Sequence, residues 1–313
     1  MTQEVSNSSL RVAARLAVGF ALDLVKLSGF GRDVIDGLLL AAISQANVAL
    51  ITRDPDLQHT YASLDQPPPD ELRRPVSINA IAGSLRIPFE TTRRRIAALI
   101  EAGVLQSTRR GVILPLAPLN SAYYRAVAEA NYALVRSLYF RLRQIGMLSD
   151  LARPNTPPFD PDSPPIRLVI RLSADYLLRL VDPLQRNIGD LVSGLILLDV
   201  FHANTEHLSD ADGGDEGGEW TENGFVSDSD RRPVSAADIA RRLGISHETV
   251  RRRLIRLVAD GKCERCDEGY WVTSRILGDG LLGVVLTNQI HLQRLFANLG
   301  ELGVVSEWER HEI

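Results

Sequence analysis

Four stretches of the chain carry the apolar pattern of long helices. Residues 33–50 and 190–204 are apolar on nearly every side, which is typical of helices covered by several neighbours. Residues 120–146 and 278–303 instead carry apolar side chains at spacings of three and four, the period of an amphipathic helix. We therefore expect a mainly α-helical protein in which these helices form the body.

The segment between the two helices of each pair is an internal repeat. Residues 73–114 align with residues 231–272 without a gap, with 17 identities in 42 positions. Both copies open with Arg-Arg-Pro-Val-Ser, and both contain Glu-Thr followed, one residue later, by three arginines. The flanking helices match as well, so the chain is a duplication in which each half reads as helix, motif, helix.

The motif predicts two short helices, a turn and a β-hairpin. In the second copy, Ser235 is placed to cap the first helix, with Asp238 at the spacing of a capping box, and Gly244 ends it. The next helix is expected over 247–260, and residues 262–272 alternate loosely, as a short hairpin does.

Composition divides the chain into two halves. We expect a first half over 8–150, a proline-rich linker over 151–165 and a second half over 166–306. Within the second half, residues 205–230 hold nine acidic side chains, five glycines and no lysine or arginine, which predicts a mobile insert. The flanking helices should arrange the duplicated motifs as an intramolecular pseudo-dimer.

The arginine triplets and the nearby glutamates are the candidate chemistry. An α-helix fits the major groove of DNA, where arginine pairs with guanine and glutamate accepts from cytosine, while neighbouring arginines hold phosphates. We expect the helices over 89–102 and 247–260 to enter successive major grooves of double-stranded DNA.

The stretch from Ser246 to Arg252 resembles the recognition helix of the catabolite-activator family, in the winged helix-turn-helix superfamily of bacterial transcription regulators. The resemblance implies that Glu248 and Arg252 read bases, while Ser246 and Thr249 contact the DNA backbone. It covers the two motif segments only. No cyclic-nucleotide-binding barrel is apparent, so that family's cofactor and activation mechanism do not transfer.

The first copy departs from this pattern at three positions. Pro88 and Phe89 replace Ser246 and His247, and Arg86 occupies the position of the turn glycine. Base choice is therefore expected to differ between the halves. The candidate DNA-binding residues are Ser77, Glu90, Thr91, Arg93, Arg94, Arg95, Arg109 and Arg110 in the first copy, and Ser235, Ser246, His247, Glu248, Thr249, Arg251, Arg252 and Arg253 in the second.

The distribution of charge agrees with this assignment. The net charge of the whole chain is −4, but the first motif carries +6 and the second +4, which leaves −14 on the remainder. The predicted wings differ in sign, because Arg109 and Arg110 occupy the first hairpin turn and Asp267 and Glu268 the second. Only the first wing is expected to approach DNA.

Other kinds of site receive little support. Cys263 and Cys266 have the spacing of a metal knuckle without a second pair, and the former aligns with a core leucine. The glycine pattern over 278–283 lacks the strand and helix of a dinucleotide site. Two matching pairs of asparagines, Asn47 with Asn204 and Asn131 with Asn288, are interpreted as buried amides that fix helix register, with an effector pocket as the alternative.

We thus expect a transcription regulator that is not an enzyme and that uses no cofactor and no metal. It should be cytoplasmic and associated with the nucleoid, with no membrane span, as a monomeric pseudo-dimer or a homodimer. Any small-molecule effector is unidentified at this point. Two alternatives stay open: a protein-interaction scaffold of tandem winged helices, as in chromosome segregation, and a replication initiator.

Overall fold

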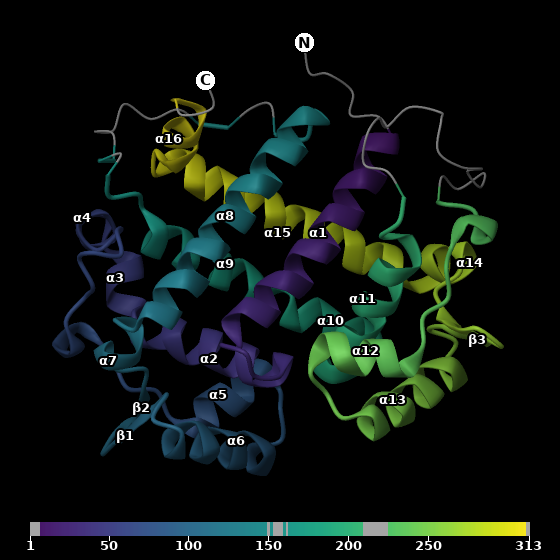
Figure 1. Ribbon diagram of the computed structural model, residues 1–313, viewed down its shortest axis with the longest axis horizontal. Helices are drawn as coiled ribbons and strands as arrows, with labels where there is room; N and C mark the ends of the chain where they lie inside the picture. The colour runs from purple at the N-terminus through teal and green to yellow at the C-terminus, as the bar shows by residue number, and fades with distance from the viewer. Residues whose placement is uncertain (1–6, 149–150, 153–158, 161, 209–224, 311–313) are drawn as a thin grey trace. The chain divides into compact units, whose positions relative to one another are not determined.

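The computed structural model describes residues 7–148, 151–152, 159–160, 162–208 and 225–310. Over these residues the chain is mainly helical, with two small antiparallel sheets of two strands each (Figure 1). The expectation of a mainly α fold is confirmed. None of the described helices combines the length and the apolar character needed to cross a membrane.

Two compact units make up the fold, and each combines three segments of sequence. The first-motif unit comprises residues 24–137, 150–179 and 294–313. The second-motif unit comprises residues 1–23, 138–149 and 180–293. Each motif segment lies whole within one unit.

The first-motif unit contains the first repeat and the helices that cover it. Its elements are α2 (Val34–Asn47), α3 (Ala49–Arg53), α4 (Pro55–Thr60), η1 (Asp70–Leu72), α5 (Ile78–Leu85), α6 (Phe89–Glu101), β1 (Gln106–Thr108), β2 (Gly111–Ile113), α7 (Leu116–Leu119), α9 (Ile166–Arg179) and α16 (Val304–Arg310). Helices α1 (Asn7–Ser28), α8 (Ala122–Gln144) and α15 (Leu282–Glu301) contribute residues to both units.

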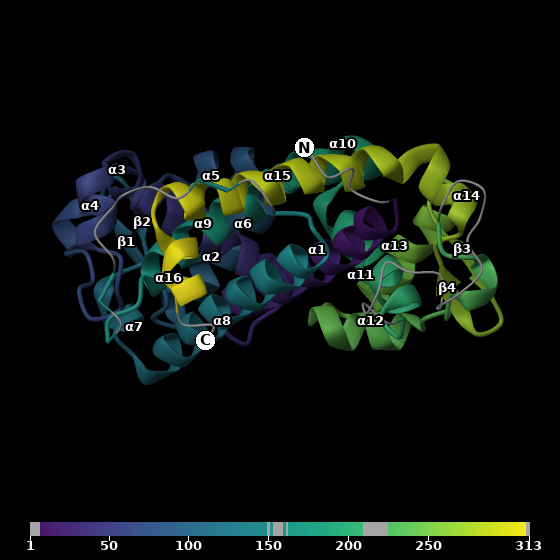
Figure 2. The same ribbon diagram turned by 90° about the horizontal axis from the view of Figure 1, so that it is seen from above.

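The second-motif unit repeats this order around the second motif. Its elements are α10 (Val181–Ile188), α11 (Leu191–Thr205), η2 (Asp228–Asp230), α12 (Ala236–Leu243), α13 (His247–Ala259), β3 (Glu264–Cys266), β4 (Gly269–Trp271), α14 (Ser274–Ile276) and the π-helical turn η3 (Leu277–Leu281). Helix α12 packs beside α13, as α5 packs beside α6 (Figures 1 and 2).

Each unit includes helical segments from the other half of the sequence. Helix α9 follows the expected linker in sequence but packs against α2 in the first-motif unit. The beginning of α1 belongs to the second-motif unit, where Gly19 lies so close to the His202 ring of α11 that a Cβ would come within 2.8 Å of it. The expected domain ranges therefore follow the repeat in sequence, whereas the units combine both halves.

The expected linker and acidic insert are described only in part. Residues 153–158, 161 and 209–224 lie outside the described residues. Most of the insert that was expected to be mobile falls among them. Within the linker, Phe159 is buried and stacks on His59 with the ring centroids 5.0 Å apart. This part of the linker therefore packs against the first-motif unit.

Candidate nucleic-acid interface

The first helix of each motif begins at a serine that caps it. The hydroxyl oxygen of Ser77 accepts a hydrogen bond from the Ala80 backbone N–H at 3.1 Å, and Ser235 accepts from Asp238 at the same distance. The Ser235 hydroxyl also donates to the Asp238 carboxylate, and this hydrogen bond lowers the pKa of that carboxyl group. Both serines therefore carry a structural role in beginning the helix.

The turn between the two helices has the same conformation in both copies. Gly244 adopts a left-handed backbone with φ of 66°, and Arg86 adopts it with φ of 48°. The N–H of the isoleucine that follows the turn residue donates to an alanine carbonyl of the preceding helix, at 3.1 Å in the first copy and 3.2 Å in the second. The arginine thus forms a turn that usually requires glycine, at a cost of about 1–2 kcal/mol.

The second helix of each motif begins differently. Ser246 caps α13 by accepting from the Thr249 N–H at 3.3 Å, whereas Pro88 begins α6 without a side-chain cap. The next residue is an exposed His247 in α13 and an exposed Phe89 in α6, whose exposed fraction is 48%. The two helices therefore present different chemistry at their first turn.

A glutamate and two arginines form the exposed face of this helix in both copies. Glu90 pairs with Arg93 at 2.6 Å, and Glu248 pairs with Arg251 at 2.9 Å. Hydrogen bonds from these arginines lower the pKa of each glutamate, so both stay ionised. Exposed ion pairs of this kind contribute little to the stability of the fold. Their side chains can therefore leave each other and contact a ligand.

The second arginine of each triplet is the least constrained of the three. Arg94 and Arg252 are both exposed, and the closest acidic oxygen to Arg252 is that of Glu248, at 3.8 Å. Thr91 and Thr249 are half-buried beside them.

The third arginine of each triplet faces its own unit. Arg95 pairs with Asp33 at 2.8 Å and with Asp36 at 2.7 Å. Arg253 pairs with Asp190 at 2.6 Å. Asp33 and Asp190 are the N-cap residues of α2 and α11, so the same ion pair fixes the second motif helix to the body in both units.

Sequence reasoning grouped this third arginine with the two exposed ones. A signal that could have separated it is its spacing: Arg253 lies three residues after the buried Val250 and four before the buried Leu257. Such a position borders the buried stripe of a helix. The acidic partners lie about 60 residues earlier in the sequence, so no local pattern names them.

Asn47 and Asn204 hold the hairpin of their own unit. The side-chain N–H groups of Asn47 donate to the Arg74 and Val112 carbonyls at 2.7 and 3.3 Å, and its oxygen accepts from the Leu114 N–H at 2.8 Å. Asn204 makes the same three bonds, to Arg232, Tyr270 and Val272, at 2.8, 3.2 and 2.9 Å. Both amides are fully buried, as expected, but they fix the hairpin rather than a helix register.

A glycine in each hairpin permits a close approach of the chain before it. Val76 pairs with Val112 and Val234 pairs with Tyr270, which adds a third extended segment to each hairpin. A Cβ on Gly111 would lie 2.3 Å from the Val76 carbonyl oxygen, and one on Gly269 would lie 2.4 Å from that of Val234. Only glycine fits these two places.

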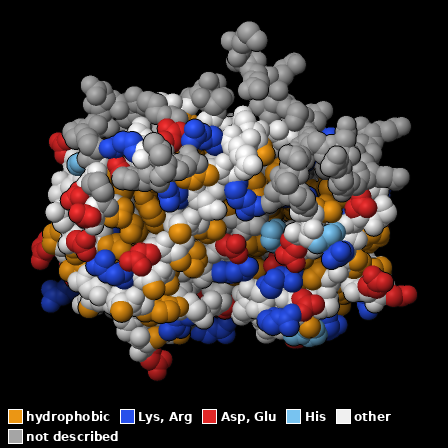
Figure 3. Space-filling model, turned by 45° about the horizontal axis from the view of Figure 1, so that its top comes forward, with side chains coloured by type: hydrophobic (Ala, Val, Ile, Leu, Met, Phe, Trp, Pro, Cys, Tyr) orange, Lys and Arg blue, Asp and Glu red, His pale blue; other side chains and the backbone are white. Residues whose placement is uncertain are grey.

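The hairpin tips carry the charge difference seen in the sequence. Arg109 and Arg110 are exposed at the tip between β1 and β2, and Asp267 and Glu268 are exposed between β3 and β4. On the face drawn in Figure 3, basic and acidic side chains are interspersed.

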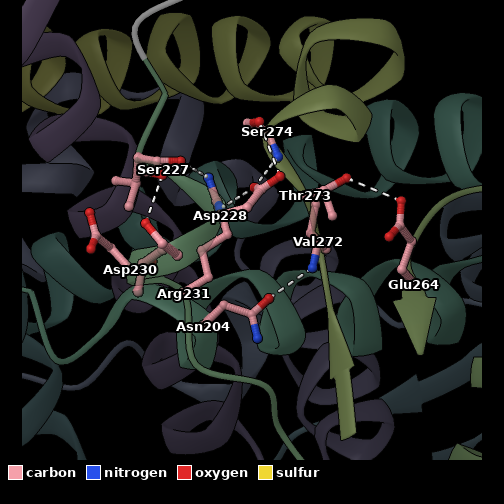
Figure 4. A network of polar contacts seen from close by, with 12 residues as sticks. Asn204, Ser227, Asp228, Asp230, Arg231, Glu264, Val272, Thr273 and Ser274 are labelled. Atoms are coloured by element: carbon pink, nitrogen blue, oxygen red, sulfur yellow. Dashed lines mark hydrogen bonds and ion pairs between the residues drawn. The ribbon is translucent and has the colours of Figure 1, made fainter. Parts of the chain in front are cut away.

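A buried arginine and its aspartate partner link the short helical turn before each motif to the helix that follows the hairpin, as Figure 4 shows for the second copy. The Arg231 guanidinium pairs with Asp228 at 3.3 Å, and this carboxylate also accepts from the Ser274 N–H at 2.7 Å. In the first copy, Arg73 donates to Asp70 at 2.8 Å, which accepts from the Leu116 N–H at 3.1 Å. Sequence reasoning missed this network, although the shared Arg-Arg-Pro-Val-Ser is its signal.

The cysteines occupy the second hairpin. Cys263 is buried, and burial raises the pKa of its thiol to about 12, so it stays protonated at neutral pH. It corresponds to the buried Leu105 of the first copy. Cys266 is half-buried, and its thiol contacts the Gly269 carbonyl oxygen at 3.7 Å.

Comparisons of the chain with protein-family models, with curated proteins and with solved structures found no match. The function is therefore inferred from the residues and their geometry. The exposed side chains of α6 and α13 and the first hairpin tip are the parts of the candidate site that face solvent.

Proposed function

We propose that this chain is a sequence-specific, double-stranded DNA-binding transcription regulator built on two winged helix-turn-helix motifs. Helices α6 and α13 would act as recognition helices. The observation that carries the proposal is the repeated exposed face, in which a glutamate and two arginines stand free of the body while the third arginine anchors the helix. A helix face that only contacts water would not require the same anchored arrangement in both copies.

Each exposed residue has a proposed role. Arg94 and Arg252 would pair with guanine, because they are exposed and the least constrained, and Glu90 and Glu248 would accept from cytosine. Phosphate contacts would come from other exposed groups, among them Arg93, Arg109, Arg110, Ser246 and Arg251. We assign Arg95 and Arg253 to positioning, since their guanidinium groups already pair with acidic side chains.

The expected DNA site follows from the duplication. Two recognition helices in successive major grooves, about 34 Å apart, would read an imperfect palindrome. The half-sites would differ because Phe89 in α6 suits a thymine methyl group, whereas His247 in α13 offers a hydrogen bond.

Selection from a random DNA pool, followed by titration of the winner at several salt concentrations, tests the proposal. We expect a two-part motif with a steep salt dependence. Arg94→Ala and Arg252→Ala should each weaken binding by about 1–3 kcal/mol and relax a different half-site. Arg256→Ala is the matched control, because this arginine lies exposed at the far end of α13.

Two results would contradict the proposal. If both substitutions weaken binding to all sequences equally, the two arginines contact phosphates only. If folded protein recovers no DNA at low salt, the tandem motifs would be better explained as a protein-interaction scaffold.

A further inference from the structure

The first-motif unit contains a cavity to which α6 contributes no lining residue. Its volume is about 250 Å³, and its lining includes Leu64, Leu119, Asn120, Ser121, Tyr124 and Arg167. This volume is slightly below the usual range for drug-sized ligands, so it suits a small molecule. The lining combines apolar side chains with hydrogen-bonding groups.

Arg167 is a buried cation without an acidic partner. Its exposed fraction is 5%, and no carboxylate oxygen of the described residues lies within ion-pair distance of it. One terminal nitrogen donates to the Leu64 and Leu119 carbonyls over long distances of 3.3 and 3.4 Å, and Nε has no partner. Burial lowers the pKa of this guanidinium.

Leaving a charged group buried without a partner is costly, so such groups are usually paired. Nearby, Arg171 is also buried without an acidic partner among the described residues, and its Nε too has no partner, but its terminal nitrogens donate to the Tyr61 and Gln58 carbonyls at 2.8 and 3.0 Å. Arg171 does not line the cavity, whereas Arg167 does. Of these two buried charges without an acidic partner, only that of Arg167 borders the cavity.

Tyr124 supplies a second hydrogen-bonding group. Its ring lies under the Arg167 guanidinium, with 5.4 Å from the guanidinium carbon to the ring centroid. Its hydroxyl has no partner among the described residues, and burial raises its pKa, so the hydroxyl stays protonated and able to donate. A guanidinium and a phenol on one wall offer donors to a single anionic group.

The rim of the cavity limits the charge of a ligand. Asp65 and Arg125 both line the cavity and pair with each other at 2.9 Å, each more than half exposed. Their charges offset one another, which leaves Arg167 as the net charge of the lining. One negative charge on the ligand would balance it.

We propose that this cavity binds a small monocarboxylic acid, with its carboxylate on Arg167 and Tyr124 and its apolar part against Leu64 and Leu119. The planar guanidinium favours a carboxylate because it can donate two parallel hydrogen bonds to it. This proposed site does not rest on the proposed DNA binding, because no candidate DNA-binding residue lines the cavity.

The second half of the chain lacks the same lining. In the flanking alignment, Ser121, Tyr124 and Arg125 correspond to Gly278, Leu281 and Leu282. Gly278 faces the Phe225 ring, where a Cβ would lie 3.8 Å from it. The proposed site therefore belongs to the first-motif unit and gives one ligand per chain.

Calorimetric titration of the full chain with acetate, butyrate and benzoate tests the proposal, with butyramide and benzamide as neutral analogues. We expect at least one acid to bind at one site per chain with a Kd below about 10 mM. Its amide should bind at least about tenfold more weakly, because it lacks the charge that Arg167 requires. Arg167→Gln should abolish binding, while Arg171→Gln should keep it.

A rim substitution keeps the test decisive if the buried arginine variants fail to fold. Asp65→Asn removes a negative charge from an exposed position and should tighten binding of the acid about two- to fivefold. The proposal is overturned if no acid binds, if acid and amide bind equally, or if Asp65→Asn or a folded Arg167→Gln leaves the affinity unchanged. Tighter binding of inorganic phosphate than of every acid would overturn the ligand class.

Discussion

The two motif units keep the same internal bonds and differ on the surfaces that those bonds support. Asn47 and Asn204 make the same three hydrogen bonds to their hairpins, with lengths that agree within about 0.1 Å. The start of the exposed helix and the hairpin tip differ in residue type and in charge. The duplicated hydrogen bonds thus set the geometry of the motif. The exposed positions can carry different residue types in the two copies without changing that geometry.

An ion pair inside the second-motif unit has no counterpart in the first. In the second-motif unit, Arg242 pairs with Asp199 at 2.5 Å, and that carboxylate is almost fully buried, with an exposed fraction of 1%. Ser84 and Ala42 occupy the corresponding places in the first-motif unit. A buried ion pair in one copy and a small neutral pair in the other fill the same position, so the pair is not required by the fold.

The largest expected effect is the loss of stability when the hydrogen bonds of Asn47 or Asn204 to the hairpin are removed. Asn47→Leu and Asn204→Leu should each lower the free energy of unfolding by about 4 kcal/mol, because a buried N–H and two carbonyls lose their partner. Equal losses in a chemical denaturation series would confirm that the amide has the same role in both units. The exposed Asn79→Leu serves as the control and should change stability by less than about 0.5 kcal/mol.

A smaller loss of stability is expected when the ion pair between Arg242 and Asp199 is broken, which only the second-motif unit has. Arg242→Ser should cost about 3 kcal/mol, because it leaves the Asp199 carboxylate buried without a counter-ion. Combining it with Asp199→Ala recreates the pair of the first-motif unit and should recover most of the stability. If the double variant is as unstable as Arg242→Ser alone, the ion pair is a requirement of this unit after all.

The pattern of the sequence predicted the exposed helices well. The expected range 247–260 compares with α13 (His247–Ala259), and the expected range 89–102 compares with α6 (Phe89–Glu101). Their apolar stripes are strong local signals, and serine or proline marks each start. Alignment with Gly244 also placed Arg86 at the turn, where the structure has its positive φ.

Contacts between residues far apart in the sequence could not be predicted from the local pattern. The partner of Arg95 is 62 residues away, and several acidic side chains of the chain could have taken that role. Helix α9 packs in the first-motif unit although it follows the linker. With two copies of a similar surface in one chain, periodicity does not say which copy a helix will cover.

The hairpin tips differ in charge between the copies, and this difference should change DNA binding. Asp267→Arg combined with Glu268→Arg gives the second tip the charge of the first. We expect DNA affinity to rise and the slope of log K against log salt to become steeper by about 1–2, because new phosphate contacts release counterions. Arg109→Asp combined with Arg110→Glu, the opposite exchange, should lower the slope; an unchanged slope in both variants would place the tips away from the DNA.

The smallest expected effect concerns the turn between the two motif helices. Both copies have the same left-handed backbone there, with Arg86 in one and Gly244 in the other. Arg86→Gly should raise the free energy of unfolding by about 0.5 kcal/mol, because it removes a left-handed penalty of about 1–2 kcal/mol and adds back the larger backbone entropy of glycine in the unfolded chain. Gly244→Arg in the other copy should lower it by a similar amount. A loss of stability in Arg86→Gly, measured by denaturant unfolding, would mean that the arginine side chain offsets the strain of its own backbone, and that the turns are held in different ways.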